Sequence, residues 1–211
     1  MRIKPKPLGE YSLILRPFFW NQKRKYGAVL DAALLWARTP PLFLGVAFLY
    51  GRIDRRRSPI APVLRSLVSV RVSQLNGCGF CVDINSATLM NLGVSADKLL
   101  ALSTWRDSDL FDDRERVVLD YAETVTAASN RVIDAQIDGL REFFTDDAIV
   151  ELTGLIAFQN MSSKFNSALG VEQQGFCQIK GIDRPAGAEM GRPQIGATSI
   201  GKLPKERGEM G

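Results

Sequence analysis

The sequence predicts an all-α protein, because apolar residues recur at helical spacing along most of the chain and no segment alternates as a strand would. Its composition, with 45% apolar and 24% charged residues in a chain of 211, is typical of a globular protein with one buried core. A Cys-x-x-Cys sequence, Cys78 and Cys81, directly follows the clearest helical segment. The apolar stripe of that segment consists of Leu64, Leu67, Val68, Val72 and Leu75.

The apolar segment 27–50 predicts two packed helices rather than a transmembrane span. Asp31, Arg38 and the pair Pro40-Pro41 interrupt it well short of the roughly 20 apolar residues that a span requires. We therefore expect no transmembrane segment.

Start and stop residues bound the helices that follow the cysteines. A helix over 80–92 is expected to end at Gly93, because glycine is typical of the position just after a helix. Further helices begin at or just after four residues of the kind that caps a helix N-terminus, and Glu115 completes a capping box in the second of them. These residues are Ser95, Asp112, Asp134 and Thr145.

Charge and composition divide the chain into three parts. Residues 1–26 carry seven basic side chains against one glutamate, whereas the net charge of the whole chain is only +4. We expect this basic N-terminal arm to be solvated, or to pack through Phe18, Phe19 and Trp20 either on a second subunit or on the chain's own surface. The pattern does not favour nucleic-acid binding, because basic and aromatic residues do not interleave in it. Residues 27–171 form the helical domain. Residues 172–211, rich in Gly, Pro, Lys and Glu, form an irregular C-terminal tail.

The N-terminal region lacks the features of a secretory signal, since the apolar run 11–19 is short and interrupted by Arg16-Pro17. We therefore expect a cytoplasmic protein. In that compartment a Cys-x-x-Cys pair is normally reduced or catalytic rather than a structural staple. The chain contains no histidine, so its cysteines act without imidazole.

Four interpretations of Cys78 and Cys81 are compatible with their spacing. A zinc site needs four ligands, and this chain adds only Cys177 to the pair. A structural disulfide would close too short a loop to remove much entropy from the unfolded chain. The two thiols could also pack simply as small apolar groups. Redox chemistry has the best physical support, because a helix start favours thiolate and one helical turn brings the two sulfurs within bonding reach.

The residues around the cysteine pair resemble a known family. Residues 71–81, Arg-Val-Ser-Gln-Leu-Asn-Gly-Cys-x-x-Cys, are similar to the motif of the AhpD-like, carboxymuconolactone decarboxylase superfamily. Three further segments agree in order, namely 99–106, 111–123 and 149–153. The resemblance implies an all-helical fold assembled as homo-oligomers, often trimers or hexamers.

Some members of that superfamily reduce alkyl hydroperoxides. The resemblance implies that Cys81 attacks the peroxide, that Cys78 resolves the resulting sulfenic acid, and that an external lipoyl-type dithiol returns the electrons without a bound cofactor or metal. Those members carry a relay glutamate twelve residues before the first cysteine and a relay histidine four residues after the second. These positions are occupied here by Ser66 and Asn85. Since acid–base assistance is typically worth about 10²- to 10⁴-fold in rate, we expect a slow peroxidase.

Three carboxylates lie near or beyond the motif. Asp83 is expected to be a solvated surface group, because a separation of two residues turns it away from Cys81 on a helix. Glu123 is expected on the surface of another helix, and the sequence does not place it or Glu151 relative to the cysteines.

The sequence thus predicts a thiol–disulfide redox protein with weak peroxidase activity and with Cys78 and Cys81 as its catalytic residues. The decarboxylase branch of the superfamily relies on a histidine, so that activity is not expected here. The alternative is a catalytically degenerate oligomeric scaffold or a small-molecule binding protein of the same fold.

Overall fold

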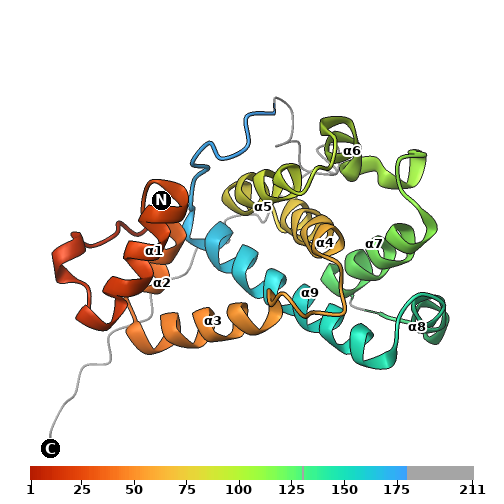
Figure 1. The fold of residues 1–211 in the computed structure, drawn as a ribbon, viewed down its shortest axis with the longest axis horizontal. Coiled ribbons are helices and arrows are strands. Elements are labelled where there is room, and N and C mark those ends of the chain that lie inside the picture. The colour runs from red at the N-terminus through yellow and green to blue at the C-terminus, as the bar shows by residue number, and fades with distance from the viewer. Residues whose placement is uncertain (130, 180–211) are drawn as a thin grey trace, which may run out of the picture.

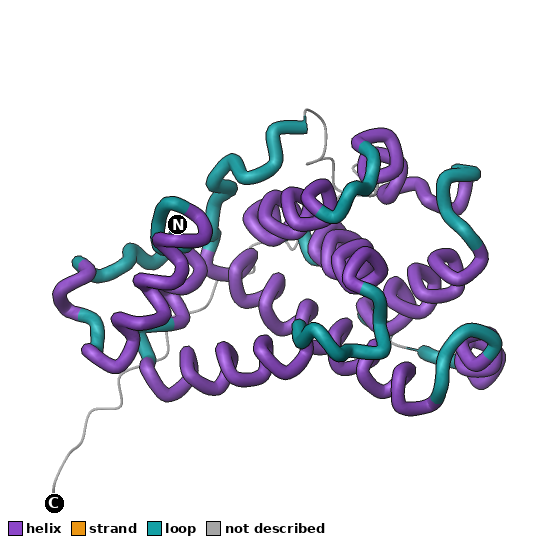
Figure 2. The backbone as a smooth tube through the Cα atoms, in the orientation of Figure 1, coloured by secondary structure: helices purple, strands orange, loops and turns teal. Residues whose placement is uncertain are grey.

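The computed structural model describes residues 1–129 and 131–179. This part of the chain consists of helices and loops and contains no strand (Figure 2). The predicted all-α class is therefore confirmed. Within the same residues, no helix is both long enough and apolar enough to cross a membrane.

The described residues contain nine α-helices and three short 3₁₀ helices. The α-helices are α1 (Arg16–Tyr26), α2 (Asp31–Trp36), α3 (Pro40–Ile53), α4 (Pro62–Leu75), α5 (Gly79–Asn91), α6 (Ala96–Ala101), α7 (Asp113–Thr126), α8 (Asp134–Arg141) and α9 (Asp146–Leu169). The 3₁₀ helices are η1 (Leu8–Glu10), η2 (Leu13–Leu15) and η3 (Leu102–Asp107).

The predicted helix boundaries agree with the structure to within one or two residues. Two helices, α2 and α3, occupy the apolar segment 27–50. Helix α5 is followed by Gly93 in the left-handed region, with φ of 89°. The capping box of α7 is complete, because the Glu115 N–H donates to Asp112 Oδ1 at 2.8 Å and the Asp112 N–H donates to Glu115 Oε2 at 3.0 Å.

Helix α4 lies among its neighbours α5, α7 and α9 and is packed against all three (Figure 1). Nine of its 14 residues are buried, as expected for a helix enclosed on several sides. Val68 and Val72 face an apolar core shared with α7, α8 and α9. Leu67 and Val70 face a second core shared with α5, α6 and η3. The orientation of α4 therefore sets the position of the cysteines at its C-terminal end.

A third apolar core joins residues 1–50 to the cysteine pair. Phe19 is buried against Tyr11 and Phe43, with ring centroids 5.4 and 6.3 Å away in edge-to-face arrangements. Cys78 and Cys81 belong to this same core. The basic N-terminal arm therefore packs on its own chain through its apolar residues. Its basic residues around α1 are exposed, and they include Arg16, Lys23, Arg24 and Lys25.

The first described residues of the C-terminal tail cross the start of α5 and are fastened there by Asp83. The buried Asp83 carboxylate accepts hydrogen bonds from the backbone N–H groups of Gln174 at 3.0 Å, Gly175 at 2.8 Å and Cys177 at 2.6 Å. The expectation that Asp83 is a solvated surface group is therefore wrong. Its side chain does turn away from Cys81, but it turns toward a segment about ninety residues later in the chain.

Residues 172–179 are irregular, as expected for the tail, and they make specific contacts with the helices. The Gln173 side chain lies against Gly79, where an added Cβ would come within 3.1 Å of its Nε2 atom. The ring of Phe176 packs on Tyr26 with centroids 5.7 Å apart. Cys177 is free and partly buried. The remainder of the expected tail, 180–211, lies outside the described residues.

Replacing Asp83 by alanine should loosen this tail, because three backbone N–H groups lose their acceptor at once. We expect Asp83→Ala to lower the free energy of unfolding by on the order of 3 kcal/mol in urea titrations and to speed proteolysis between residues 171 and 179. The exposed Asp109 supplies the control variant Asp109→Ala. Equal stability and equal proteolysis in the two variants would show that the carboxylate does not hold the tail.

Candidate active site

The turn between α4 and α5 places the first cysteine at a helix start. Gly77 adopts the left-handed conformation, with φ of 60°. Its N–H donates to the Gln74 carbonyl at 3.1 Å, and the Cys78 N–H donates to the Ser73 carbonyl at 3.0 Å. These two bonds form the Schellman arrangement that ends a helix, for which glycine is favoured because it lacks a Cβ. Cys78 is therefore at once the last residue of this turn and the N-cap of α5.

Cys78 and Cys81 are joined in a disulfide, with their Cα atoms 5.2 Å apart. The predicted proximity of the two sulfurs is confirmed. Cys81 lies in the first turn of α5, where its N–H donates to Cys78 Sγ at 3.2 Å. In the reduced protein, the unpaired N–H groups and the dipole of this 13-residue helix favour a thiolate at its start.

The two sulfurs differ in the space around them. Both residues are buried, Cys78 with 1% and Cys81 with 3% of its surface exposed. Cys81 nevertheless lines a pocket of about 340 Å³ that opens to solvent between α1, α2, α3, α5 and α9. Cys78 is not among the residues that line it. A small molecule that enters this pocket therefore meets Cys81 first.

The lining of this pocket is largely apolar and aromatic. Its seven aromatic residues are Phe18, Tyr26, Trp36, Phe43, Tyr50, Phe80 and Phe158. Five of them come from residues 18–50, so the N-terminal helices supply one wall of the pocket. Lys25 is the one charged side chain among the described residues that line it.

Asn166 is the polar residue in direct contact with Cys81. It lies on α9 with 2% of its surface exposed, and its Nδ2 donates to Cys81 Sγ at 3.3 Å. Its Oδ1 is buried without a hydrogen-bond partner among the described residues. Sequence reasoning missed this residue. The available signal was the polar stripe of α9, in which Gln159, Ser163 and Asn166 recur at spacings of four and three.

Neutral amides and hydroxyls occupy the region where the family's relay is expected. Asn85 lines the pocket, and its Nδ2 lies 3.5 Å from Ser73 Oγ. The same hydroxyl accepts a hydrogen bond from Gln159 Nε2 at 2.8 Å. Ser66 is partly buried on α4 and is not among the lining residues. These groups can orient a ligand or a thiolate, but they do not exchange protons at neutral pH.

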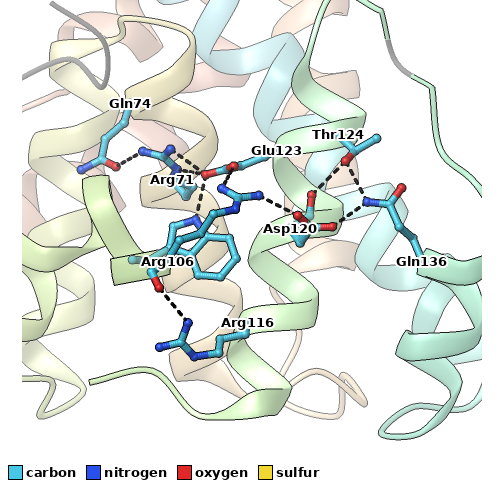
Figure 3. Close-up of polar contacts among 9 residues, drawn as sticks. Arg71, Gln74, Arg106, Arg116, Asp120, Glu123, Thr124 and Gln136 are labelled. Atoms are coloured by element: carbon cyan, nitrogen blue, oxygen red, sulfur yellow. Dashed lines mark hydrogen bonds and ion pairs between the residues drawn. The ribbon is translucent and has the colours of Figure 1, made fainter. Parts of the chain in front are cut away.

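Glu123 holds α4, η3 and α7 together rather than serving the pocket (Figure 3). Its Oε1 accepts hydrogen bonds from Arg71 Nε at 2.6 Å and from Trp105 Nε1 at 2.8 Å, and its Oε2 pairs with Arg106. The side chain of Glu123 is 17% exposed, so this glutamate is partly buried among its partners and is not the freely solvated surface group that was expected. Burial by itself raises the pKa of Glu123, but the hydrogen bonds from Arg106 and Trp105 and the charge of Arg71 hold that pKa below its ordinary value.

Neither of the two distant glutamates reaches the cysteine pocket. Glu151 pairs with Arg55 and accepts a hydrogen bond from Ser58 at 3.1 Å, nearer the N-terminal end of α9 than the residues that line the pocket. Glu123 is absent from the pocket lining as well. Over the described residues, no three His, Cys, Asp or Glu side chains come together in a group that could hold a metal ion.

Fold and site together define an all-helical protein in which a Cys-x-x-Cys pair opens a helix beside an aromatic pocket. The chain belongs to the carboxymuconolactone decarboxylase family, whose profile matches residues 41–124. The protein YnjA of Escherichia coli (strain K12) is 46% identical over 173 residues, which are 82% of this chain and 95% of YnjA. The resemblance inferred from the motif is thereby confirmed.

Solved structures show the same fold at low sequence identity. The alkylhydroperoxidase AhpD core of a peroxidase-related protein from Ralstonia eutropha JMP134 has a TM-score of 0.74 and 23% identity, covering 87% of this chain and 97% of that one. A variant of the debrominase Bmp8 in complex with 2,3,4-tribromopyrrole has a TM-score of 0.72 and 19% identity, covering 83% of this chain and 93% of that one.

The contact from Asn166 predicts a measurable effect on Cys81 once the pair is reduced. An amide N–H beside sulfur stabilises the thiolate, so Asn166→Ala should move the midpoint pH for alkylation of Cys81 upward by about one pH unit. The rate of iodoacetamide labelling as a function of pH measures this shift. Asn91→Ala, at the exposed far end of α5, is the matched control. An unchanged midpoint pH for alkylation of Cys81 in Asn166→Ala would mean that the amide does not stabilise the thiolate.

The lowered pKa of Glu123 predicts how stability depends on pH. Because the folded-state pKa lies below the unfolded value, the contribution is complete above the unfolded value and is lost as pH falls through the folded value. Glu123→Gln should therefore destabilise the protein by about 2 kcal/mol at neutral pH, and the deficit should shrink below about pH 4. Urea unfolding at both pH values measures it. The exposed Glu142→Gln should show no deficit at either pH, and a pH-independent deficit for Glu123→Gln would refute the charge argument.

Proposed function

We propose that this protein is a thiol–disulfide oxidoreductase that reduces a small organic hydroperoxide through Cys81 and Cys78. The observation that carries the proposal is the asymmetry of the pair: the two sulfurs are bonded at the start of α5, and Cys81 alone of the two lines the pocket. This arrangement suits Cys81 as the attacking thiolate and Cys78 as the resolving thiol. Membership of the family, and the likeness to an AhpD core, support the same assignment.

In the proposed reaction the Cys81 thiolate attacks the terminal oxygen of the hydroperoxide. The O–O bond breaks, Cys81 becomes a sulfenic acid, and the departing alkoxide takes a proton to give an alcohol. The Cys78 thiolate then attacks the sulfur of Cys81, and hydroxide leaves and is protonated to water as the disulfide forms. An external dithiol of the lipoyl type supplies two electrons and two protons, restores both thiols and becomes a disulfide itself. The net reaction converts hydroperoxide and dithiol into alcohol, water and disulfide.

The polar groups of the pocket give this reaction a particular character. Asn166 and the start of α5 stabilise the thiolate, which supports attack by Cys81. The leaving alkoxide takes its proton from water, because Asn85 and Gln159 are neutral amides. A slow peroxidase follows, since general acid catalysis is typically worth about 10²-fold or more. We place the activity in the cytoplasm, where reduced dithiols are available.

A second candidate is an oligomeric scaffold or a small-molecule binding protein that keeps the fold without the peroxidase chemistry. The residues Ser66 and Asn85 at the relay positions favour it, since neither can transfer a proton at neutral pH. The debrominase Bmp8, in complex with 2,3,4-tribromopyrrole, illustrates a protein of this fold that acts on a different small molecule.

Assembly into trimers or hexamers is part of the same proposal. Helices α3 and α9 border an apolar groove of about 500 Å³. Apart from Phe158, the residues that line this groove differ from those that line the cysteine pocket. Leu49, Val150 and Met161 in this groove are exposed, and a contiguous apolar surface of this kind is typical of subunit contacts.

Thiol titration after treatment with cumene hydroperoxide tests the proposed function. In a Cys177→Ser background, the reduced protein should lose both remaining thiols and two hydrogens of mass, because a disulfide forms. In the same background, Cys81→Ser should leave the Cys78 thiol unreacted. Cys78→Ser should accumulate a sulfenic acid at Cys81, which dimedone traps. An unchanged thiol titre in the Cys177→Ser protein would reject the redox assignment and favour the scaffold.

A further inference from the structure

The pocket beside Cys81 has the features of a binding site for one class of small molecule. Its volume of about 340 Å³ lies within the range of small-ligand pockets, and residues on five helices enclose it. Trp36, Phe43, Phe80 and Phe158 line it and are all buried, whereas Phe18 and Tyr50 line it at exposed positions. Rings at both depths provide faces and edges for an aromatic guest.

One polar atom beside Cys81 Sγ lacks a hydrogen-bond partner, and this indicates which polar group a ligand of the pocket carries. Asn166 lines the pocket, is 98% buried, and already uses its Nδ2 to contact Cys81 Sγ. Its Oδ1 is buried with no hydrogen-bond partner among the described residues. A buried acceptor of this kind costs free energy unless a donor reaches it. A ligand with an O–H or N–H next to Cys81 would supply that donor.

From this geometry we propose that the pocket binds an apolar aromatic compound with a hydrogen-bond donor, its ring among the aromatic side chains and its donor on Asn166 Oδ1 beside Cys81. This inference deepens the proposed function, because it names the substrate class as aryl-substituted hydroperoxides. The terminal O–H of such a hydroperoxide, held by Asn166 Oδ1, brings the oxygen that is attacked next to the sulfur. The reaction is the one written above, with an aryl alcohol as its organic product.

Binding can be measured apart from catalysis in a chain that cannot react. We choose the Cys78→Ser/Cys81→Ser protein and three probes: cumyl alcohol, which has ring and donor; tert-butanol, which has the donor without the ring; and cumyl methyl ether, which has the ring without the donor. Isothermal titration should give cumyl alcohol a dissociation constant roughly 10- to 100-fold lower than that of tert-butanol, because the ring buries more apolar surface. The ether should bind roughly tenfold more weakly than the alcohol, since it leaves Oδ1 without a donor.

A pocket-filling substitution locates the binding. Ala47 lines the pocket from α3, so Ala47→Phe in the same double-serine protein should abolish the binding of cumyl alcohol. Ala135→Phe, on the exposed surface of α8, is the matched control and should bind it normally. Circular dichroism checks that both variants fold, and the comparison of the three probes does not depend on either variant.

The outcomes separate this inference from the proposed function. Equal affinity for cumyl alcohol and tert-butanol, equal affinity for alcohol and ether, or full binding in folded Ala47→Phe would overturn the assignment of the substrate class. Aryl-selective binding with no thiol loss to any hydroperoxide would support the pocket assignment and reject the peroxidase. Thiol loss at equal rates with cumene hydroperoxide and hydrogen peroxide would support the peroxidase and overturn the aryl selectivity.

Discussion

The conformation of Gly77 is the constraint on which the site depends. By adopting φ of 60°, Gly77 ends α4 and lets α5 begin directly afterwards. Cys78 therefore completes the C-terminal turn of α4 and is also the N-cap of α5. A side chain at this position would carry the strain of the left-handed region, and relief of that strain would redirect the chain. The short turn also brings Cys78 and Cys81 under the N–H groups of a new helix. The position of the cysteine pair therefore depends on the left-handed backbone conformation of Gly77.

Around this turn the protein replaces charged acid–base groups with neutral donors and acceptors. Asn166, Asn85 and Gln159 can fix the position of a sulfur and a ligand without moving a proton. The charged groups of the motif are used for stability: Arg71 is committed to Glu123, and the Asp83 carboxylate to the tail. Among the described residues that line the pocket, only Lys25 is charged, and this suits the aromatic guest proposed above.

Segments distant in sequence complete the site around the family's helical core. Residues 18–50 supply one aromatic wall, and residues 172–179 pass the start of α5 at Gly79 and pack on Tyr26 of that wall. Figure 1 shows this segment running beside α5 and α1. Cys78 lies outside the pocket lining, and Cys81 faces the pocket. This division gives the two thiols different partners, although they are three residues apart.

The sequence alone determined the helical class, most helix boundaries and the closeness of the two cysteine sulfurs, because these follow from local rules of periodicity, capping and turn geometry. Glycine at 77 and 93 and the capping box at Asp112 and Glu115 act within a few residues, and they are readable without the fold. Only the tertiary structure decided that Asp83 is buried, that Glu123 joins three helices, that Asn166 touches Cys81, and that residues 18–50 form a pocket wall. Each of these depends on contacts between residues far apart in the sequence, and helical periodicity shows that a face is buried without showing what it is buried against.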